Sequence, residues 1–486
     1  MNVEEYCDYD ATGLAQLIRS RQVSAAEVQQ AAREAILRAD DRLNAVVGEP
    51  FEQPLAYSEN GPFAGVPFVV KDLVCHPAGV PQRAGTRMTG DGVRFDHDTF
   101  LMARFRAAGL ATLAITTTPE LGFNANTEAL AYGSTCNPWD LSRSPGGSSG
   151  GTAALVAAGA VPVGHANDGG GSIRIPASCC GLVGLKPTRG RTSLGPDYSE
   201  AVSGFAIEFA LTRTLRDCAS LLDAVAGSMP GDRYVIAQPQ RPWSQELDAS
   251  AGRLRIAFTT RAWSGVPVDK ECQAAVQKAA GELQSLGHEV EEASPSFDSE
   301  AFHLANVRIW CEFLAEGISA LAGVLGVQPS REHLEATTFA CYEYGRQLTA
   351  LQWAEAGAIV NQVSRSVGDF FTRYDLLLTP TIATPPYPLG VLNADDPSLD
   401  ADGWTRKIFT LCPFTVLFNA TGQPALSLPL SMSSDGLPIG VQLIGRMCEE
   451  AVLFRVASQL DHALPWAARR PSIHAAATPG ADAPGS

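Results

Sequence analysis

Hydrophobic residues recur with a helical spacing in some segments of this chain and form short strand-like runs in others. The first 50 residues predict two amphipathic helices. The second opens with the capping box Ser24-Ala-Ala-Glu27 and carries an apolar stripe formed by Val28, Ala31, Ala32, Ala35 and Ile36. From residue 61 to about 218, β-like runs such as 66–70 and 111–115 alternate with helical patterns. This alternation predicts an α/β fold with a mixed sheet.

The same alternation continues to the C-terminal region. Residues 254–258 and 375–379 read as strands, 269–286 as a helix, and 300–372 as long helices with scattered aromatic residues. Core packing is the favoured interpretation of most of these aromatic residues, and a pocket wall is the alternative. We divide the chain into five segments. They are an N-terminal helical segment (1–60), a core (61–225), a more variable helical part that forms the pocket wall (226–375), a C-terminal part of the core (376–466) and an Ala/Pro/Gly-rich flexible tail (467–486).

Charge and composition exclude several classes of function. The net charge of −16 and a pI near 5.0 disfavour binding to nucleic acids and to anionic membranes. Residues 1–10 are acidic and lack the apolar stretch of a secretory signal, and no apolar run reaches the roughly 18 residues of a membrane span. We therefore expect a cytoplasmic protein. The eleven scattered cysteines and eight histidines show no metal-binding spacing, so we expect reduced thiols and no metal.

Three segments carry candidate chemistry: 70–72 with Lys71, 144–151 with Ser148 and Ser149, and 168–176 with Ser172. Taken singly, each is more simply a strand end, a turn or a linker. Together they supply what a nucleophilic serine needs, which is a base and a cradle of backbone N–H groups. The three glycines before Ser172 can direct successive N–H groups into one concavity. A lysine can serve as the base if burial keeps it neutral.

These segments resemble the signature of the amidase signature enzymes. That family has a Gly-Gly-Ser-Ser-Gly-Gly segment followed by Gly-Gly-Ser-Ile-Arg, and its two catalytic serines lie about two dozen residues apart. Here Ser148 and Ser172 are 24 positions apart, and the family lysine falls on Lys71. The resemblance covers nearly the whole chain and is weakest across 225–370. It extends through 118–120, 137–139, 185–191, 378–381, 418–424 and 436–442.

The resemblance implies both a fold and a mechanism. The fold is a central mixed β-sheet covered by helices on both faces. Ser172 would be the nucleophile, Ser148 a bridging serine after a cis peptide bond, and Lys71 the base. Ser149 would support this triad, and Asp168 and Arg174 would brace the loop. The oxyanion would bind to the N–H groups of Gly169, Gly170, Gly171 and Ser172. The mechanism requires no metal and no organic cofactor.

Some positions differ from many members of the family, and others are similar to one subgroup of it. Many family members have Gly-Ser/Thr-Asp-Thr where this chain has 166–169, Ala-Asn-Asp-Gly, which changes side chains beside the oxyanion loop. Residues 137–139, 167–168 and 187–191 are similar to the 6-aminohexanoate cyclic-dimer hydrolases. We therefore predict an amidase that hydrolyses a small-molecule amide, linear or cyclic, through an acyl-serine intermediate. Cys311 is predicted to line the pocket, with a core position as the equal alternative. A homodimer is one assembly that the sequence allows.

Four other interpretations stay open at this stage. The same triad could hydrolyse carbamates (urethanes) or esters. The chain could be the amidase subunit of a tRNA-dependent amidotransferase, but Ile175 stands where that subgroup usually has Gln. Residues 147–151 also fit G-x-S-x-G, with Ser149 as nucleophile, but residues 139–145 do not form the required strand. A binding protein on this scaffold would be expected to have lost a triad residue, and none is missing.

Overall fold

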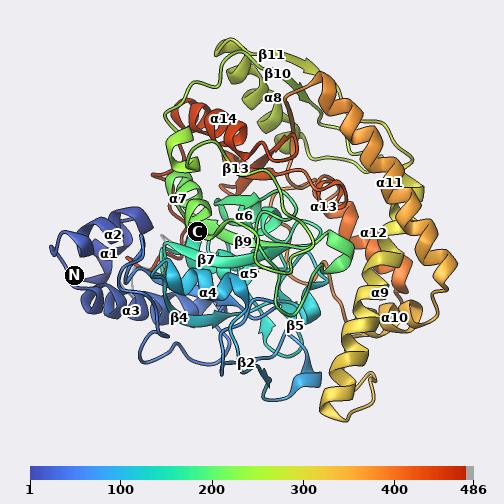
Figure 1. The fold of residues 1–486 in the computed structure, drawn as a ribbon, viewed down its shortest axis with the longest axis horizontal. Coiled ribbons are helices and arrows are strands. Elements are labelled where there is room, and N and C mark those ends of the chain that lie inside the picture. The colour runs from blue at the N-terminus through green and yellow to red at the C-terminus, as the bar shows by residue number, and fades with distance from the viewer. Residues whose placement is uncertain (478–486) are drawn as a thin grey trace.

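An eight-stranded sheet lies at the centre of the computed structural model, which describes residues 1–477 (Figure 1). The strand order is β11-β10-β12-β14-β13-β8-β9-β7. Strand β10 is parallel to β11 and β12, and all other neighbours are antiparallel, so the predicted mixed α/β sheet is confirmed. The strands are β7 (Val163–Asp168), β8 (Val183–Lys186), β9 (Ile207–Thr212), β10 (Arg255–Phe258), β11 (Glu289–Glu292), β12 (Leu376–Pro380), β13 (Ala425–Met432) and β14 (Pro438–Gly445).

A parallel pair, β1 (Pro67–Lys71) and β4 (Ala111–Thr116), lies beside the sheet and has β1 next to β7. Every residue of β1, β4 and β7 is buried, which explains why the first two read as unbroken apolar runs in the sequence. Both were predicted to within one residue. Two short antiparallel ladders complete the strands: β2 (Pro81–Gln82) with β3 (Val93–Arg94), and β5 (Glu128–Ala129) with β6 (Gly133–Ser134).

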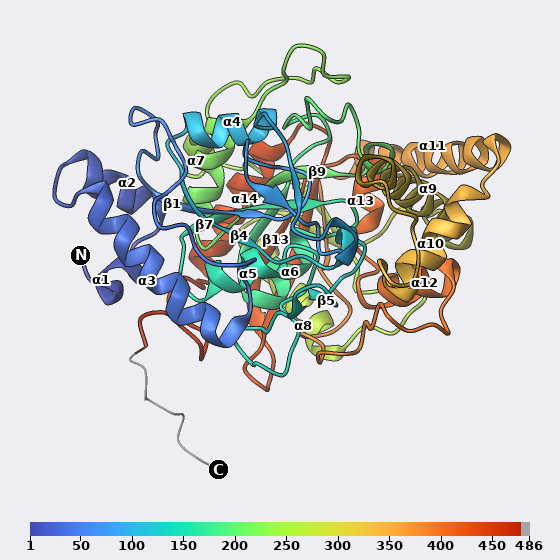
Figure 2. The same cartoon turned by 90° about the horizontal axis from the view of Figure 1, so that it is seen from below.

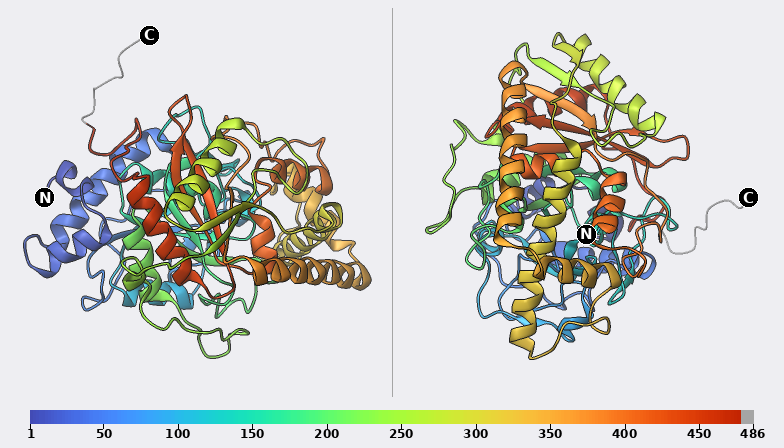
Figure 3. Two further views of the ribbon diagram at one scale, coloured as in Figure 1. Left: turned by 90° about the horizontal axis from the view of Figure 1, so that it is seen from above. Right: turned by 90° about the vertical axis from the view of Figure 1, so that its right-hand side faces the viewer.

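Helices cover both faces of the sheet (Figure 3). In β14 a Cβ on Gly440 would lie 2.5 Å from Oγ of Ser178 in α6, whereas a Cβ on Gly445 would lie 3.3 Å from Leu453 in α14. Because successive side chains of a strand point to opposite faces, these two helices lie on opposite sides of the sheet. Helix α5 contacts α6, and α7 and α8 contact α14. These helices are α5 (Gly150–Ala157), α6 (Arg174–Cys180), α7 (Leu215–Val225), α8 (Lys270–Ser285) and α14 (Glu450–Ala463).

The N-terminal segment forms three helices where the sequence pattern predicts two (Figure 2). The helices are α1 (Val3–Cys7), α2 (Ala11–Arg19) and α3 (Ala25–Leu43). Helix α1 has five residues, which is too short for an apolar period to be recognised. The predicted capping box at Ser24 is present, and the whole predicted stripe of α3 is buried. Helix α4 (Phe100–Ala107) precedes β4.

The predicted helical region 300–372 forms a layer on the side of the molecule opposite the N-terminal helices (Figure 1). Helix α9 is the longest of this group and contacts α10, α11 and α12. The predicted region contains α9 (Ser299–Leu325), α10 (Ala336–Arg346) and α11 (Ala350–Arg373). Helices α12 (Ala401–Leu411) and α13 (Val416–Thr421) follow later in the chain. Among residues 1–477 no helix has the length and apolar character needed to cross a membrane.

Four single-turn 3₁₀ helices and a C-terminal extension complete the described chain. The turns are η1 (Arg87–Thr89), η2 (Glu120–Gly122), η3 (Val202–Gly204) and η4 (Trp243–Glu246). The predicted flexible tail begins at residue 467, but residues 467–477 lie against the core. There Arg469 donates to the carbonyl of Pro429 at 2.7 Å, and buried Ala475 donates its N–H to Ala158 at 2.8 Å. The rest of that predicted tail, 478–486, lies outside the described residues. The other segment boundaries stay predictions.

Candidate functional site

The three segments singled out in the sequence converge at one point beside β7. Lys71 ends β1, Ser148 precedes α5, and Ser172 lies between β7 and α6. The Lys71 side chain is fully buried, and its Nζ donates to Ser148 Oγ at 2.7 Å and to Asn167 Oδ1 at 2.6 Å. Because β1 runs beside β7, the end of one strand brings Lys71 to the Asn167 side chain of the other.

Burial lowers the pKa of Lys71 to about 7, although the negative charges of Glu208 and Asp168 act in the opposite direction. A buried ammonium loses its hydration, so the protein environment favours the neutral amine. An amine whose pKa is close to 7 has a substantial unprotonated fraction at neutral pH. Lys71 can therefore accept a proton from the Ser148 hydroxyl that it contacts.

The turn that carries Ser148 is packed so tightly that one position admits only glycine. A Cβ on Gly147 would lie 2.1 Å from the carbonyl oxygen of Asn126. The Gly147–Ser148 peptide bond is cis, as the family resemblance implies. The next residue, Ser149, donates its hydroxyl to the Asn167 carbonyl at 3.3 Å and lies 3.4 Å from the Asn167 N–H. These contacts attach the serine turn to β7.

The loop from Gly169 to Ser172 presents free backbone N–H groups. Within residues 1–477, none of its four N–H groups donates to a protein acceptor, whereas those of Ile173 and Arg174 both donate to Asp168 Oδ2. Gly171 has φ of 138°, and a Cβ there would lie 2.5 Å from Thr415 Oγ1, so another residue would not fit. Unpaired N–H groups of this kind can bind a negatively charged oxygen.

A buried ion pair holds this loop. Arg174 donates to both carboxylate oxygens of Asp168, at 2.8 and 2.9 Å, and neither side chain is exposed. Arg174 also donates to Gln442 and Asn419 at 2.6 Å each. Burial alone would raise the pKa of Asp168, but the charge and hydrogen bonds of Arg174 outweigh it and lower that pKa to about 2. Neither Asp168 nor Arg174 lines the cavities beside Ser172.

Ser172 and Ser148 line the same cavity, which has a volume of about 40 Å³. Ser172 is 7% exposed. In the part of the chain that the structure describes, no hydrogen bond joins the two hydroxyls directly. A proton relay between them requires the two hydroxyls to come within hydrogen-bond distance, since catalytic hydrogen bonds often shorten only when substrate binds.

Two polar residues of the site escaped the sequence reasoning. The Asn167 amide donates to Leu73 O at 3.1 Å and to Glu208 Oε1 at 3.3 Å, which fixes its oxygen toward Lys71. The sequence analysis noted Asn167 as a change beside the oxyanion loop and as part of a subgroup similarity, but gave it no role at Lys71. Glu208 is buried in β9, and no motif surrounds it. Only the pairing of β9 with β7 brings Glu208 opposite Asn167.

Two aromatic residues of α9, rather than Cys311, form a wall of the site. Trp310 and Phe313 line the cavity of the two serines, and Trp310 stacks on Phe123 with ring centroids 4.6 Å apart. Cys311 is fully buried, lies beside Cys341 of α10, and is absent from the linings of the cavities beside Ser172. The structure thus brings the neighbours of Cys311 to the cavity and turns Cys311 toward α10.

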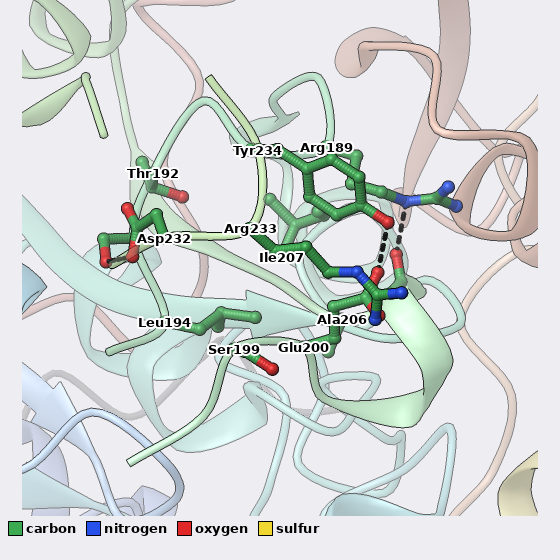
Figure 4. A pocket seen from close by; sticks show the side chains of 13 residues that line it. Arg189, Thr192, Leu194, Ser199, Glu200, Ala206, Ile207, Asp232, Arg233 and Tyr234 are labelled. Atoms are coloured by element: carbon green, nitrogen blue, oxygen red, sulfur yellow. Dashed lines mark hydrogen bonds and ion pairs between the residues drawn. The ribbon is translucent and has the colours of Figure 1, made fainter. Parts of the chain in front are cut away.

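Another wall of the cavity is a loop that is anchored by hydrogen bonds outside the cavity. Ala201 and Val202 line the cavity, and the preceding Glu200 accepts hydrogen bonds from Arg233 and Tyr234 (Figure 4). Arg189 donates to the carbonyl of Gly204 in the same loop at 2.6 Å. These residues surround a small separate cavity of about 30 Å³ (Figure 4). The loop position therefore depends on contacts made outside the cavity that the serines line.

The fold also brings together two groups of side chains of the kinds that bind metals, although the sequence has no metal-binding spacing. Cys75, His165 and Glu208 are buried behind Lys71, and His76, His97 and Asp197 lie farther out. In each group the donor atoms lie within 4.8 Å of one another. In the second group both histidines are 2.9 Å from Asp197, so hydrogen bonds already account for that arrangement.

Comparison with known proteins gives a consistent result. The family model described as Amidase matches residues 23–454. The 6-aminohexanoate-cyclic-dimer hydrolase of Paenarthrobacter ureafaciens is 40% identical over 96% of both chains, and that of Pseudomonas sp. (strain NK87) is 39% identical over the same shares. A solved 6-aminohexanoate cyclic dimer hydrolase structure has a TM-score of 0.89 and 38% identity, covering 96% of this chain and 99% of its own. A bacterial aryl acylamidase structure has a TM-score of 0.84 and 27% identity, covering 94% and 96%.

We expect the reactivity of the site to rise with pH. If neutral Lys71 activates the serines, the rate of modification by a fluorophosphonate should increase as pH rises through about 7 and then level off, because Lys71 loses its proton there. The measurement is the second-order rate constant of adduct formation between pH 5.5 and 9.5. A rate that does not change across this range contradicts the role of Lys71 as base.

The contact between Asn167 and Lys71 predicts the effect of a charge at position 167. In Asn167→Asp a carboxylate replaces the amide oxygen 2.6 Å from Nζ, and this negative charge should raise the Lys71 pKa. The rising limb should move upward by about one pH unit or more. Asn60→Asp is the control, since it adds the same charge at an exposed position. An unshifted limb in Asn167→Asp shows that this contact does not govern Lys71.

Proposed function

This chain belongs to the amidase family and hydrolyses carbon–nitrogen amide bonds, and from this premise we propose that it acts through an acyl-enzyme on Ser172. The observation that carries the proposal is the short hydrogen bond from buried Lys71 to Ser148, in the cavity that Ser172 also lines. A base, a bridging hydroxyl and a nucleophile in one enclosed place are the parts of a serine amidase.

The proposed acylation begins at Lys71. The neutral amine takes a proton from Ser148, Ser148 takes one from Ser172, and Ser172 Oγ attacks the amide carbonyl. The Ser172 and Ser148 hydroxyls must first come within hydrogen-bond distance of each other. As the tetrahedral intermediate collapses, Ser148 gives a proton to the departing nitrogen and regains one from Lys71. Water then releases the acid from Ser172 by the reverse sequence, which restores all three residues.

The roles of the surrounding groups follow from their contacts. The N–H groups of Gly169, Gly170, Gly171 and Ser172 would stabilise the oxyanion, because they have no acceptor within the protein. Asp168 and Arg174 would keep this loop in place. Asn167 accepts one N–H of Lys71 and thereby leaves the lone pair of the neutral amine free for Ser148. Asn167 is a positioning residue in this scheme, and Glu208 and Leu73 fix its orientation.

The proposed substrates are small-molecule amides, linear or cyclic. Two relatives at about 40% identity are named as hydrolases of the cyclic dimer of 6-aminohexanoate, which contains amide bonds. Carbamates and esters are alternatives for the same triad, since the oxyanion loop binds a carbonyl oxygen in each case. The amidotransferase interpretation has less support, because the matching subunit structure is 24% identical and shows only a common fold.

Three further properties are part of the proposal. A cytoplasmic location is supported by the eleven cysteines, all of which lie within residues 1–477 as free thiols. Cys311 as a determinant of substrate size has less support than the neighbouring aromatic residues, because it faces α10. A homodimer stays a proposal that light scattering of the full chain can test.

We expect the serine probe to identify the nucleophile. Intact-protein mass spectrometry after fluorophosphonate treatment should show one adduct on the wild type and none on Ser172→Ala. Ser149→Ala is the matched control, because Ser149 is also a buried serine of the site but belongs to the supporting contacts with Asn167. It should keep the adduct. An adduct that survives Ser172→Ala and disappears in Ser149→Ala would falsify the assignment.

Loss of the nucleophile should also abolish turnover. Ser172→Ala and Lys71→Ala should each lower kcat for amide hydrolysis by about 10⁴-fold or more, as removal of a member of a catalytic triad does. The assay is product release from a panel of anilides, aliphatic amides, esters and carbamates. Circular dichroism of each variant controls for folding. Residual kcat within tenfold of wild type in either folded variant contradicts the mechanism.

A further inference from the structure

Trp310 divides the space around Ser172 into two unequal cavities. Ser172, Gly122 and Trp310 line both, so the cavities meet at the nucleophile. One cavity, of about 20 Å³, is walled by residues that include Ile175 and Phe409 and does not include Ser148. It has room for roughly one or two groups the size of a water molecule. The other cavity contains Ser148.

The Ser148 cavity continues into a long groove. Leu73, Val74, Leu121 and Phe313 line both, and the groove has a volume of about 280 Å³. Much of its wall is apolar and comes from α9, through residues that include Ile318 and Leu321. Its polar pair, His76 and Asp197, is already joined by a hydrogen bond of 2.9 Å. The groove therefore suits a hydrocarbon chain or an aromatic ring.

The chemistry of amide cleavage assigns the two sides. When the C–N bond breaks, the acyl group stays on Ser172 Oγ and the nitrogen takes a proton. In the proposed function Ser148 gives that proton, so the departing nitrogen must lie within reach of Ser148 Oγ. Its substituent then extends into the cavity that contains Ser148 and onward into the groove. The acyl substituent has to occupy the other cavity.

We infer that, among linear amides, this enzyme selects those with a compact acyl group and an extended apolar amine portion. The inference rests on the proposed function, because it uses Ser148 as the proton donor. An acetyl or propionyl group fits the small cavity, where Phe409 packs 3.3 Å from a Cβ position on Gly170. A long acyl chain meets Phe409 and Ile175 there, which line this cavity beside Ser172.

Two isomeric amides test the direction of binding. N-octylacetamide and N-methylnonanamide have the same formula and closely similar hydrophobicity, but the eight-carbon chain is on the amine in the first and on the acyl group in the second. We expect kcat/KM to be at least about tenfold higher for N-octylacetamide, because even one extra methylene in a filled pocket changes kcat/KM that much. N-phenylacetamide and N-methylbenzamide form a second isomeric pair with a ring in place of the chain.

A filled groove provides a test by mutation. Gly317 lines the groove, and a Cβ there would meet no atom within 4 Å, so Gly317→Phe can enter the groove without disturbing the helix. This variant should lower kcat/KM for N-octylacetamide by tenfold or more and leave that for N-methylacetamide within about twofold. Gly323→Phe is the matched control. Gly323 is another exposed position of the same helix, where a Cβ would also meet no atom within 4 Å, but it does not line the groove.

The small cavity allows the opposite test. Phe409→Ala should enlarge it and raise kcat/KM for N-methylnonanamide relative to N-octylacetamide. Equal or reversed preference in the wild type, or hydrolysis of neither isomer while other amides are turned over, overturns the inference and leaves the role of Ser172 intact. Hydrolysis of no amide, together with the absence of a Ser172 adduct, overturns the proposed function and the inference with it.

Discussion

The site depends on one buried amine. Lys71 has no exposed surface, and in such a position an ammonium group is disfavoured unless it is hydrogen-bonded and faces negative charge. The protein supplies a balance of these effects: two acceptors within 2.7 Å, with Glu208 and Asp168 near enough to offset part of the desolvation. A more polar pocket would leave the amine charged and unable to accept a proton. A fully apolar pocket would offer the Lys71 amine no hydrogen-bond acceptor to orient it.

This balance requires that several segments keep their positions relative to one another. The parallel pair β1–β4 places Lys71, the serine turn packs against Asn126, and Asn167 of β7 connects both. The buried pair of Asp168 and Arg174 joins the end of β7 to α6. Ion pairs of this kind contribute little net stability once desolvation is counted, so their benefit here is a defined position. The covering helices serve the same purpose by keeping water out.

Sequence reasoning succeeded where the information is local or has a fixed spacing. The strands at β1 and β4, the capping box at Ser24 and the separation of Ser148 from Ser172 are all of this kind. It failed where a contact depends on how elements distant in the sequence pack together. Glu208 reaches Asn167 only through strand pairing, and a helical period cannot tell which of Trp310, Cys311 and Phe313 faces a cavity until α10 is placed against α9. The single-turn helix α1 was too short to produce a periodic pattern.

The position of Trp310 has a consequence for how such enzymes diverge. In a cyclic amide the acyl and amine portions are joined, so the ring has to extend past Trp310 into both cavities, whereas a linear amide places one portion in each. The indole of Trp310 stacks on Phe123, lines both cavities and separates one from the other. Moving or shortening this one side chain would merge them without touching the serines or the lysine. A substitution at this one pocket-lining position would therefore change the preference between cyclic and linear amides, and the catalytic residues would stay the same.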